Sequence, residues 1–208
     1  MRITVGNLKG GVAKSTTAVF LALGLARTGR VLLVDADGTN ASVLDWSSNT
    51  ADWPANIVVI PWAVEDLARR VKDVASDYDH IVIDTGPEQS VILRQALLVT
   101  DELVVPVSPS PMELRKLGQT WQAAAEIDAV SPVTARVLLA KVRSGTRSAV
   151  ESRQYLEEQL ELPVMGTDIS LRESYALAWG TAPTDLDQYE QVLAELAEEA
   201  EEDEAVLA

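Results

Sequence analysis

Short apolar runs alternate with longer segments of helical periodicity along most of the chain. The runs are rich in Val, Ile and Leu and lack a regular polar alternation, which is typical of strands buried on both faces of a parallel sheet. The predicted strands are Arg2–Leu8, Arg30–Asp35, Ile57–Trp62, His80–Asp84, Leu103–Val107 and Ala135–Val142. A helical pattern follows each run except the second, after which we expect an irregular segment. With right-handed crossovers, this order predicts an α/β fold: a doubly wound, mostly parallel sheet flanked by helices, with its site at the carboxyl ends of the strands.

The last part of the chain combines one more amphipathic pattern with a run of acids. Tyr189, Val192, Leu193 and Leu196 recur at helical spacing, whereas the residues that follow are mainly Glu and Asp. We therefore expect a docked helix and then a frayed acidic tail over 197–208. The 208 residues suffice for one well-cored domain, which we place at 1–196.

The first predicted strand and its helix are joined by the run Lys9-Gly10-Gly11-Val12-Ala13-Lys14-Ser15-Thr16. In a phosphate-binding loop, glycines let backbone N–H groups turn toward phosphate oxygens, and the following helix presents its positive N-terminus to the same anion. Residues 10–16 are therefore the predicted nucleotide-binding segment, in which Lys14 neutralises the β- and γ-phosphates and Ser15 ligates Mg²⁺. The common pattern G-x-x-x-x-G-K-[ST] is broken at Leu8 and Ala13.

Three acids follow predicted strands, where the edge of a parallel sheet would bring them near the phosphate loop. Asp35 and Asp37 stand two residues apart after the second strand, and Asp84 ends the fourth. Phosphoryl transfer needs acids that handle magnesium and the attacking water. The structural alternatives are an Asp-Gly turn at Asp37 and a helix cap at Asp84.

The glycine-rich run fits K-G-G-x-G-K-[ST]-T except at Ala13, and with the acids it resembles the deviant Walker A box of the ParA/MinD family of P-loop ATPases. The resemblance runs in order from residue 1 to about 120 and is nearest to small ParA-type partition and positioning ATPases without an N-terminal DNA-binding domain. It implies that Lys9 is the signature lysine, that Asp37 orients water, and that Asp35 and Asp84 lie at the magnesium shell. Gly38-Thr39 stands where the family usually has Pro-Gln.

Later segments carry a weaker part of the same resemblance. It places Arg143 and Pro183 near adenine, and Arg147 and Arg172 on a DNA-binding surface. The balance of charge between Arg136 and Arg153 is locally basic, which indicates a basic patch on an otherwise acidic protein. Such a patch would bind DNA without sequence specificity and in a salt-sensitive way.

The function implied by the resemblance is a switch driven by ATP and Mg²⁺. Lys9 would cross a face-to-face homodimer and touch the partner's nucleotide, so that dimerisation depends on ATP. The dimer would bind nonspecific nucleoid DNA, and a small ParB-like or cargo-adaptor protein would stimulate slow hydrolysis. The cargo, whether plasmid, chromosome or protein organelle, cannot be read from the sequence.

The amino-acid composition excludes several classes of protein. The chain has no cysteine, which excludes disulfides and thiolate-held metal centres, and no apolar run of membrane-spanning length. We therefore expect a cytoplasmic, nucleoid-associated protein. The net charge of −15 comes largely from an acidic C-terminal segment, and this segment argues against binding to anionic lipid.

Two other functions stay open at this point. A metabolic P-loop ligase of the dethiobiotin-synthetase type shares the sheet and loop but needs a second substrate pocket, for which no residues stand out. A non-hydrolysing, nucleotide-dependent binding module is suggested by Ala13. The last glycine of such loops often has positive φ, where a Cβ costs about 1–2 kcal/mol, and this strain is expected to slow hydrolysis.

Overall fold

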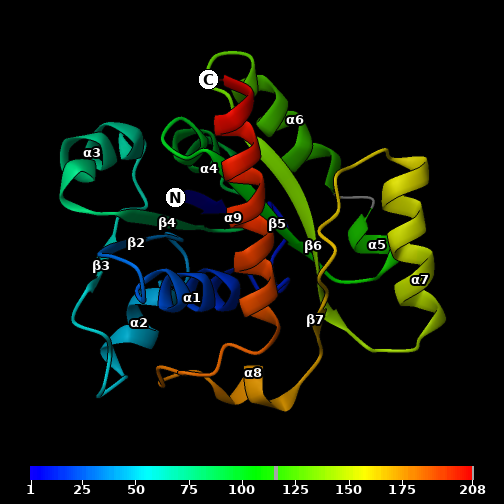
Figure 1. Ribbon diagram of the computed structural model, residues 1–208, viewed down its shortest axis with the longest axis horizontal. Helices are drawn as coiled ribbons and strands as arrows, with labels where there is room; N and C mark the ends of the chain where they lie inside the picture. The colour runs from blue at the N-terminus through cyan, green and yellow to red at the C-terminus, as the bar shows by residue number, and fades with distance from the viewer. Residues whose placement is uncertain (115–116, 208) are drawn as a thin grey trace.

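A seven-stranded parallel sheet forms the centre of the computed structural model, which describes residues 1–114 and 117–207, with 199–207 described by their backbone alone (Figure 1). The strand order is β3-β2-β4-β1-β5-β6-β7, and every pairing is parallel. The strands are β1 (Arg2–Val5), β2 (Val31–Ala36), β3 (Ile57–Pro61), β4 (His80–Thr85), β5 (Glu102–Val107), β6 (Thr134–Val142) and β7 (Ile169–Ser170). The predicted doubly wound α/β fold is confirmed.

Helices cover both faces of this sheet. They are α1 (Lys14–Leu25), α2 (Ser42–Ser48), α3 (Leu67–Val74), η1 (Ala75–Asp77), α4 (Ser90–Leu97), α5 (Pro111–Leu114), α6 (Leu117–Asp128), α7 (Arg147–Gln154), the π-helical turn η2 (Tyr155–Gln159), α8 (Glu173–Leu177) and α9 (Gln188–Leu207). One core packs α1, α2 and α9 on one face of the sheet, and two further cores pack α3, α4 and α6 on the other. The order β2-β4-β1 brings the ends of three strands together beside the loop that enters α1.

Two elements differ from the sequence prediction. The segment after β2, expected to be irregular, contains α2, whose N-terminus is held by the carboxylate of Asp35. The short strand β7 was not predicted, because two residues leave no hydrophobic pattern to detect. The six predicted strands are all present, with ends that shift by up to three residues.

The C-terminal helix docks where its apolar spacing predicts. Tyr189, Val192 and Leu196 are fully buried against α1, and Tyr189 stacks on Phe20 with ring centroids 4.8 Å apart. The Tyr189 hydroxyl also hydrogen-bonds Thr17 in α1 at 3.0 Å. The backbone remains helical through the acidic segment as far as Leu207, and the fraying expected for 197–208 stays a prediction.

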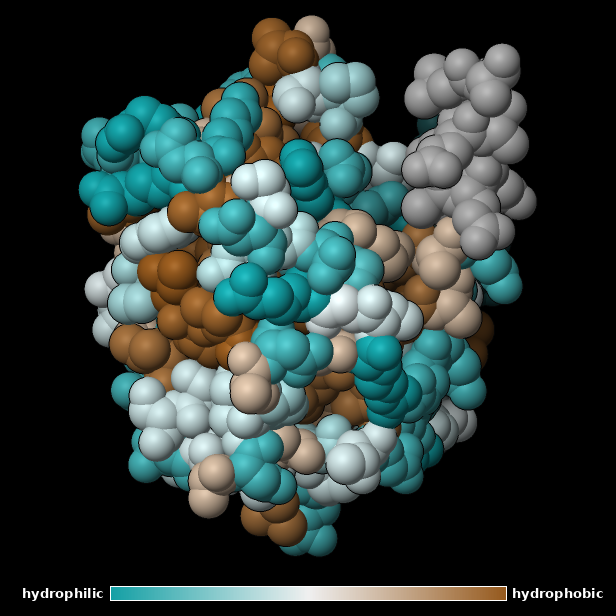
Figure 2. Space-filling model, turned by 60° about the vertical axis from the view of Figure 1, so that its left-hand side comes forward, coloured by the Kyte–Doolittle hydropathy of each residue, from teal (hydrophilic) through white to brown (hydrophobic). Residues whose placement is uncertain are grey.

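The surface carries scattered apolar patches. On the face shown in Figure 2, hydrophilic residues surround several separate hydrophobic areas. In the part of the chain that the structure describes, no helix has the length and apolar character needed to cross a membrane.

Candidate nucleotide-binding site

The loop between β1 and α1 lines an open cavity of about 310 Å³ at the carboxyl edge of the sheet. Its lining residues are Gly10, Gly11, Val12, Ala13, Lys14, Ser15, Thr16, Asp37, Asn40, Ser42, Pro87 and Lys141. The predicted segment 10–16 therefore forms one wall, and Asp37 faces it from β2. The amides at the start of α1 and the Lys14 side chain make this cavity suited to a polyphosphate.

Two residues of the loop have left-handed backbone conformations. Gly11 has φ 77°, which glycine adopts without steric cost. Ala13 has φ 70° and ψ 26° and serves as the N-cap residue of α1 without a side-chain hydrogen bond. The strain expected from the missing glycine is therefore present in the fold.

Replacing Ala13 with glycine is expected to raise the free energy of unfolding by about 1 kcal/mol, because relief of Cβ strain exceeds the extra entropy of the unfolded chain. Ala41 supplies a matched control, since it has φ 44° at the N-cap of α2. Ala41→Gly should give a similar gain in urea unfolding, whereas only Ala13→Gly should alter ATP turnover. An Ala13→Gly variant no more stable than the parent, beside a stabilised Ala41→Gly, would refute the assignment of strain to Ala13.

Lys14 is buried at the start of α1, where its side chain is 7% exposed. Its ammonium donates a 2.8 Å hydrogen bond to the carbonyl of Lys9, across the base of the loop. Burial lowers the pKa of Lys14, while the nearby Asp84 and Asp37 carboxylates act in the opposite direction. The positive charge is thus held between the loop and the acids at the strand ends.

Asp84 lies fully buried at the end of β4. Neither of its carboxylate oxygens accepts a well-formed hydrogen bond within the described part of the chain. Burial raises the pKa of Asp84 to about 7, although the neighbouring Ser15 hydroxyl and Lys14 ammonium favour the charged form. A buried carboxylate that lacks a well-formed hydrogen bond among the described residues, next to a serine at the start of a phosphate loop, is a donor set that fits Mg²⁺.

The raised pKa of Asp84 predicts how the stability of the protein depends on pH. Between about pH 4 and pH 7 the folded state binds a proton that the unfolded state has released, so stability falls as the pH rises through this window. Relative to Asp84→Asn, the parent protein should lose about 2 kcal/mol of unfolding free energy between pH 5 and pH 8. Urea titrations without magnesium measure this difference, and parallel pH profiles for the two proteins would contradict it.

Asp35 and Asp37 have different surroundings despite their spacing. Asp35 accepts hydrogen bonds from the backbone amides of Asp37, Val43 and Leu44, at 3.2, 3.0 and 2.9 Å. It therefore holds the turn after β2 and the start of α2 in place. Asp37 accepts bonds from the Thr39 and Asn40 amides at 2.8 and 3.2 Å. The Asp-Gly turn is thus real, and it fixes the Asp37 carboxylate at the phosphate cavity.

A second cavity of about 280 Å³ adjoins the first. Its aromatic lining comes from Trp46, Tyr175, Trp179 and Tyr189, and it shares Ala13, Thr16 and Lys141 with the phosphate cavity. An apolar, aromatic pocket that continues from a phosphate site suits a nucleoside base. Trp46 also donates a 2.8 Å bond to the Thr181 carbonyl, which anchors the segment after α8.

The adenine contacts proposed from sequence do not coincide with this lining. Neither Arg143 nor Pro183 lines either cavity, and their roles stay predictions. Lys141 and the aromatic residues were not predicted individually as site residues. They come from separate segments around 46, 141 and 175–189, and no single local motif joins these segments.

Lys9 lies outside the phosphate cavity. Its backbone closes the base of the loop, and its side chain lines a separate open cavity of about 480 Å³ with Gly10, Glu88 and Gln119 among its neighbours. Within the described residues, the Lys9 ammonium makes no ion pair or hydrogen bond. This cation is therefore placed beside the loop and not over its own phosphate site.

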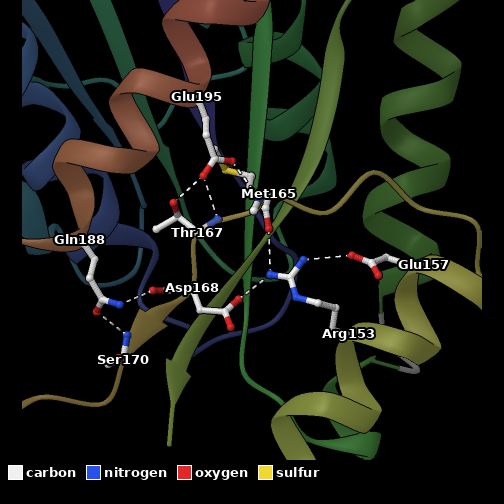
Figure 3. Close-up of polar contacts among 9 residues, drawn as sticks. Arg153, Glu157, Met165, Thr167, Asp168, Ser170, Gln188 and Glu195 are labelled. Atoms are coloured by element: carbon white, nitrogen blue, oxygen red, sulfur yellow. Dashed lines mark hydrogen bonds and ion pairs between the residues drawn. The ribbon is translucent and has the colours of Figure 1, made fainter. Parts of the chain in front are cut away.

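Arg136 and Arg153, two of the five cations between 136 and 153, are paired with acids and do not contribute free charge to a basic patch. Arg136 is 4% exposed and pairs with Glu102 in the core. Arg153 bonds Glu157, Asp168 and the Met165 carbonyl, in a network that ties α7 to the segment before β7 (Figure 3). The reason is that Glu102 pairs with Arg136, and that Glu157 and Asp168 pair with Arg153.

The two predicted DNA-contacting residues lie on different elements. Arg147 starts α7, with its side chain 89% exposed and paired with Glu151. Arg172 precedes α8, pairs with Asp187 and borders the aromatic cavity. Their assignment to DNA stays a prediction.

A parallel sheet with a phosphate loop after its first strand, a buried lysine in that loop and acids at the neighbouring strand ends defines a P-loop nucleotide-binding domain. Residues 3–199 match the family described as CbiA, the CobQ/CobB/MinD/ParA nucleotide binding domain. The chain belongs to this family, which confirms the resemblance to ParA/MinD proteins.

Similar proteins include ParA-type partition and positioning proteins. The chain is 30% identical over 176 residues to Maintenance of carboxysome distribution protein A of Halothiobacillus neapolitanus, covering 83% of this chain and 81% of that protein. It is 34% identical over 159 residues to the protein of the same name in Gloeobacter kilaueensis, covering 76% and 71%. Among solved structures, a putative plasmid partition protein of Borrelia burgdorferi bound to AMPPNP superposes with a TM-score of 0.71 at 22% identity, covering 95% and 98%.

Proposed function

We propose that this chain is an ATPase that forms a face-to-face dimer with ATP and Mg²⁺, binds nonspecific DNA as a dimer, and positions or segregates an intracellular cargo. A small ParB-like or cargo-adaptor partner would stimulate its slow hydrolysis and release it from DNA. The observation that carries the proposal is the placement of Lys9. Its side chain lines a cavity outside the phosphate site that Lys14 serves, so its charge is available to a second copy.

Each functional group of the site has one proposed task. Lys14 and the loop amides bind the β- and γ-phosphates, and Ser15 and Asp84 hold magnesium. A magnesium ion held there would supply positive charge that offsets the negative charge of the phosphates. Asp37, fixed by its turn, orients the attacking water. Lys9 of one copy counters charge on the phosphoryl group bound to the other.

The proposed cargo follows from the names of two similar proteins. Both relatives of at least 30% identity described above are named for carboxysome distribution, so a protein organelle is the first cargo to test. The protein would then act in the cytoplasm, associated with the nucleoid. The exposed Arg147 is the first residue to test for DNA contact.

ATP turnover under three conditions tests the proposed function against its alternatives. We expect slow phosphate release by the protein alone and a severalfold increase with DNA and a cognate adaptor present. Turnover that requires a small carboxylate substrate and ignores DNA would instead identify a metabolic ligase. ATP-dependent retention on DNA without any phosphate release would identify a non-hydrolysing module.

A further inference from the structure

Lys141 has an unusual backbone conformation at the end of β6. Its φ is 57°, in the left-handed region that a lysine rarely adopts. The pairing of β6 with β7 shifts register at this point, between Ala140 and Val142. Bulges of this kind redirect a side chain next to a functional site, and backbone strain gathers at such sites.

The redirected side chain reaches the phosphate loop. Its ammonium donates a 2.6 Å hydrogen bond to the carbonyl of Gly11, although the two residues lie 130 positions apart. Lys141 is one of three residues, with Ala13 and Thr16, that line both the phosphate cavity and the aromatic cavity. It therefore stands where the phosphate chain of a nucleotide meets the nucleoside.

In the part of the chain that the structure describes, no acid pairs with Lys141 to balance its charge. Lys14, by contrast, has Asp84 and Asp37 nearby. No carboxylate forms an ion pair with Lys141 within the described residues, and its contact at Gly11 is a neutral carbonyl. A phosphate oxygen is a stronger acceptor than a carbonyl for an ammonium group, because both partners are then charged.

We propose that Lys141 is a nucleotide-binding residue that contacts the α-phosphate of a nucleoside diphosphate or triphosphate. This inference rests on the proposed function, since it takes the adjoining cavities as one nucleotide site. Lys14 serves the distal phosphates, and Lys141 holds the end next to the nucleoside. The contact does not depend on the γ-phosphate, so it stabilises bound ADP and ATP equally.

Calorimetric titration with ADP and with ATP, both with Mg²⁺, tests the role of Lys141. Lys141→Met should weaken both nucleotides about tenfold, and Lys141→Arg should stay within about threefold of the parent. Lys141→Gly relieves the backbone strain but removes the ammonium, so it should lose as much affinity as Lys141→Met. Lys72→Met, which changes an exposed lysine on α3, is the matched control and should bind as the parent does.

Each contrary outcome would contradict a different part of the proposal. Parent-like affinity in both Lys141→Met and Lys141→Gly would overturn the contact. A loss for ATP alone would place the ammonium at the γ-phosphate and overturn the α-phosphate assignment. A parent protein that binds neither nucleotide would fail the proposed function itself. Lys141→Gly and Lys141→Arg keep the test valid if Lys141→Met does not fold.

Discussion

Lys9→Ala is expected to abolish ATP-dependent dimers while it leaves ATP binding within a fewfold of the parent. The Lys9 side chain lines a cavity beside the phosphate loop. Within the same chain, only the backbone carbonyl of Lys9 takes part in the loop, where it accepts a hydrogen bond from the Lys14 ammonium. Removing a charge that acts only on the second copy therefore weakens association and spares the monomer's own site. Light scattering with ATP, and nucleotide titration of the same preparation, measure the two effects.

A second lysine distinguishes loss of a specific contact from loss of surface charge. Lys72→Ala removes an exposed lysine on α3 and should leave ATP-dependent dimers intact. Dimers that persist in Lys9→Ala would show that the signature-lysine assignment is wrong for this chain. Loss of ATP binding in that variant would instead make Lys9 part of its own site.

Asp37→Ala is expected to lower ATP turnover about 100- to 1000-fold, with ATP affinity changed by less than about threefold. The carboxylate lies at the phosphate cavity and is fixed by the amides of Thr39 and Asn40, which suits it to orient a water. Because it contacts neither the loop amides nor Lys14 by hydrogen bonding, its loss should slow the chemical step without much effect on binding. Single-turnover phosphate release measures this change.

Asp66 is a suitable control for the Asp37 experiment. It lies at the N-cap of α3, where it pairs with Arg69 and Arg70 at the surface. Asp66→Ala should leave turnover unchanged. If Asp37→Ala retained its ATP turnover, Asp37 would not be the residue that orients the attacking water.

The sequence could predict those features of the fold and the site that depend on residues close together in the chain. Strands buried on both faces need continuous apolar runs, and the phosphate loop needs its glycines and lysine within a few residues. The positions of Asp37 and Asp84 follow because parallel strands end at one edge of the sheet. These features were all predicted: the structure places Asp37 at the phosphate cavity and Asp84 beside Ser15 and Lys14 of the loop.

The features that sequence could not predict depend on contacts between distant segments. Arg136 counts as a surface cation in a linear pattern, yet it faces Glu102 across neighbouring strands and is buried. The aromatic cavity draws Trp46 and Tyr175 from segments more than 100 residues apart. Lys141 reaches Gly11 where the pairing of β6 with β7 shifts register, and such a shift leaves no mark in the order of polar and apolar residues.

Asp35 lies where the sequence predicts, but it also has a structural role that the sequence did not indicate. The resemblance places it near magnesium, and it does lie beside Asp84 at the paired ends of β2 and β4. Its oxygens, however, bind three backbone amides and hold the start of α2. Its role in positioning this turn rests on these bonds, and its magnesium role stays a prediction.

The most direct test of the account is the mass of the Asp37→Ala protein in solution with Mg²⁺ and either ATP or ADP. Slow turnover keeps ATP intact during the measurement, so the mass reports the response to the γ-phosphate alone. The account predicts twice the mass of one chain with ATP and the mass of a single chain with ADP. A single-chain mass with both nucleotides would contradict the ATP-dependent dimer on which the proposed function rests.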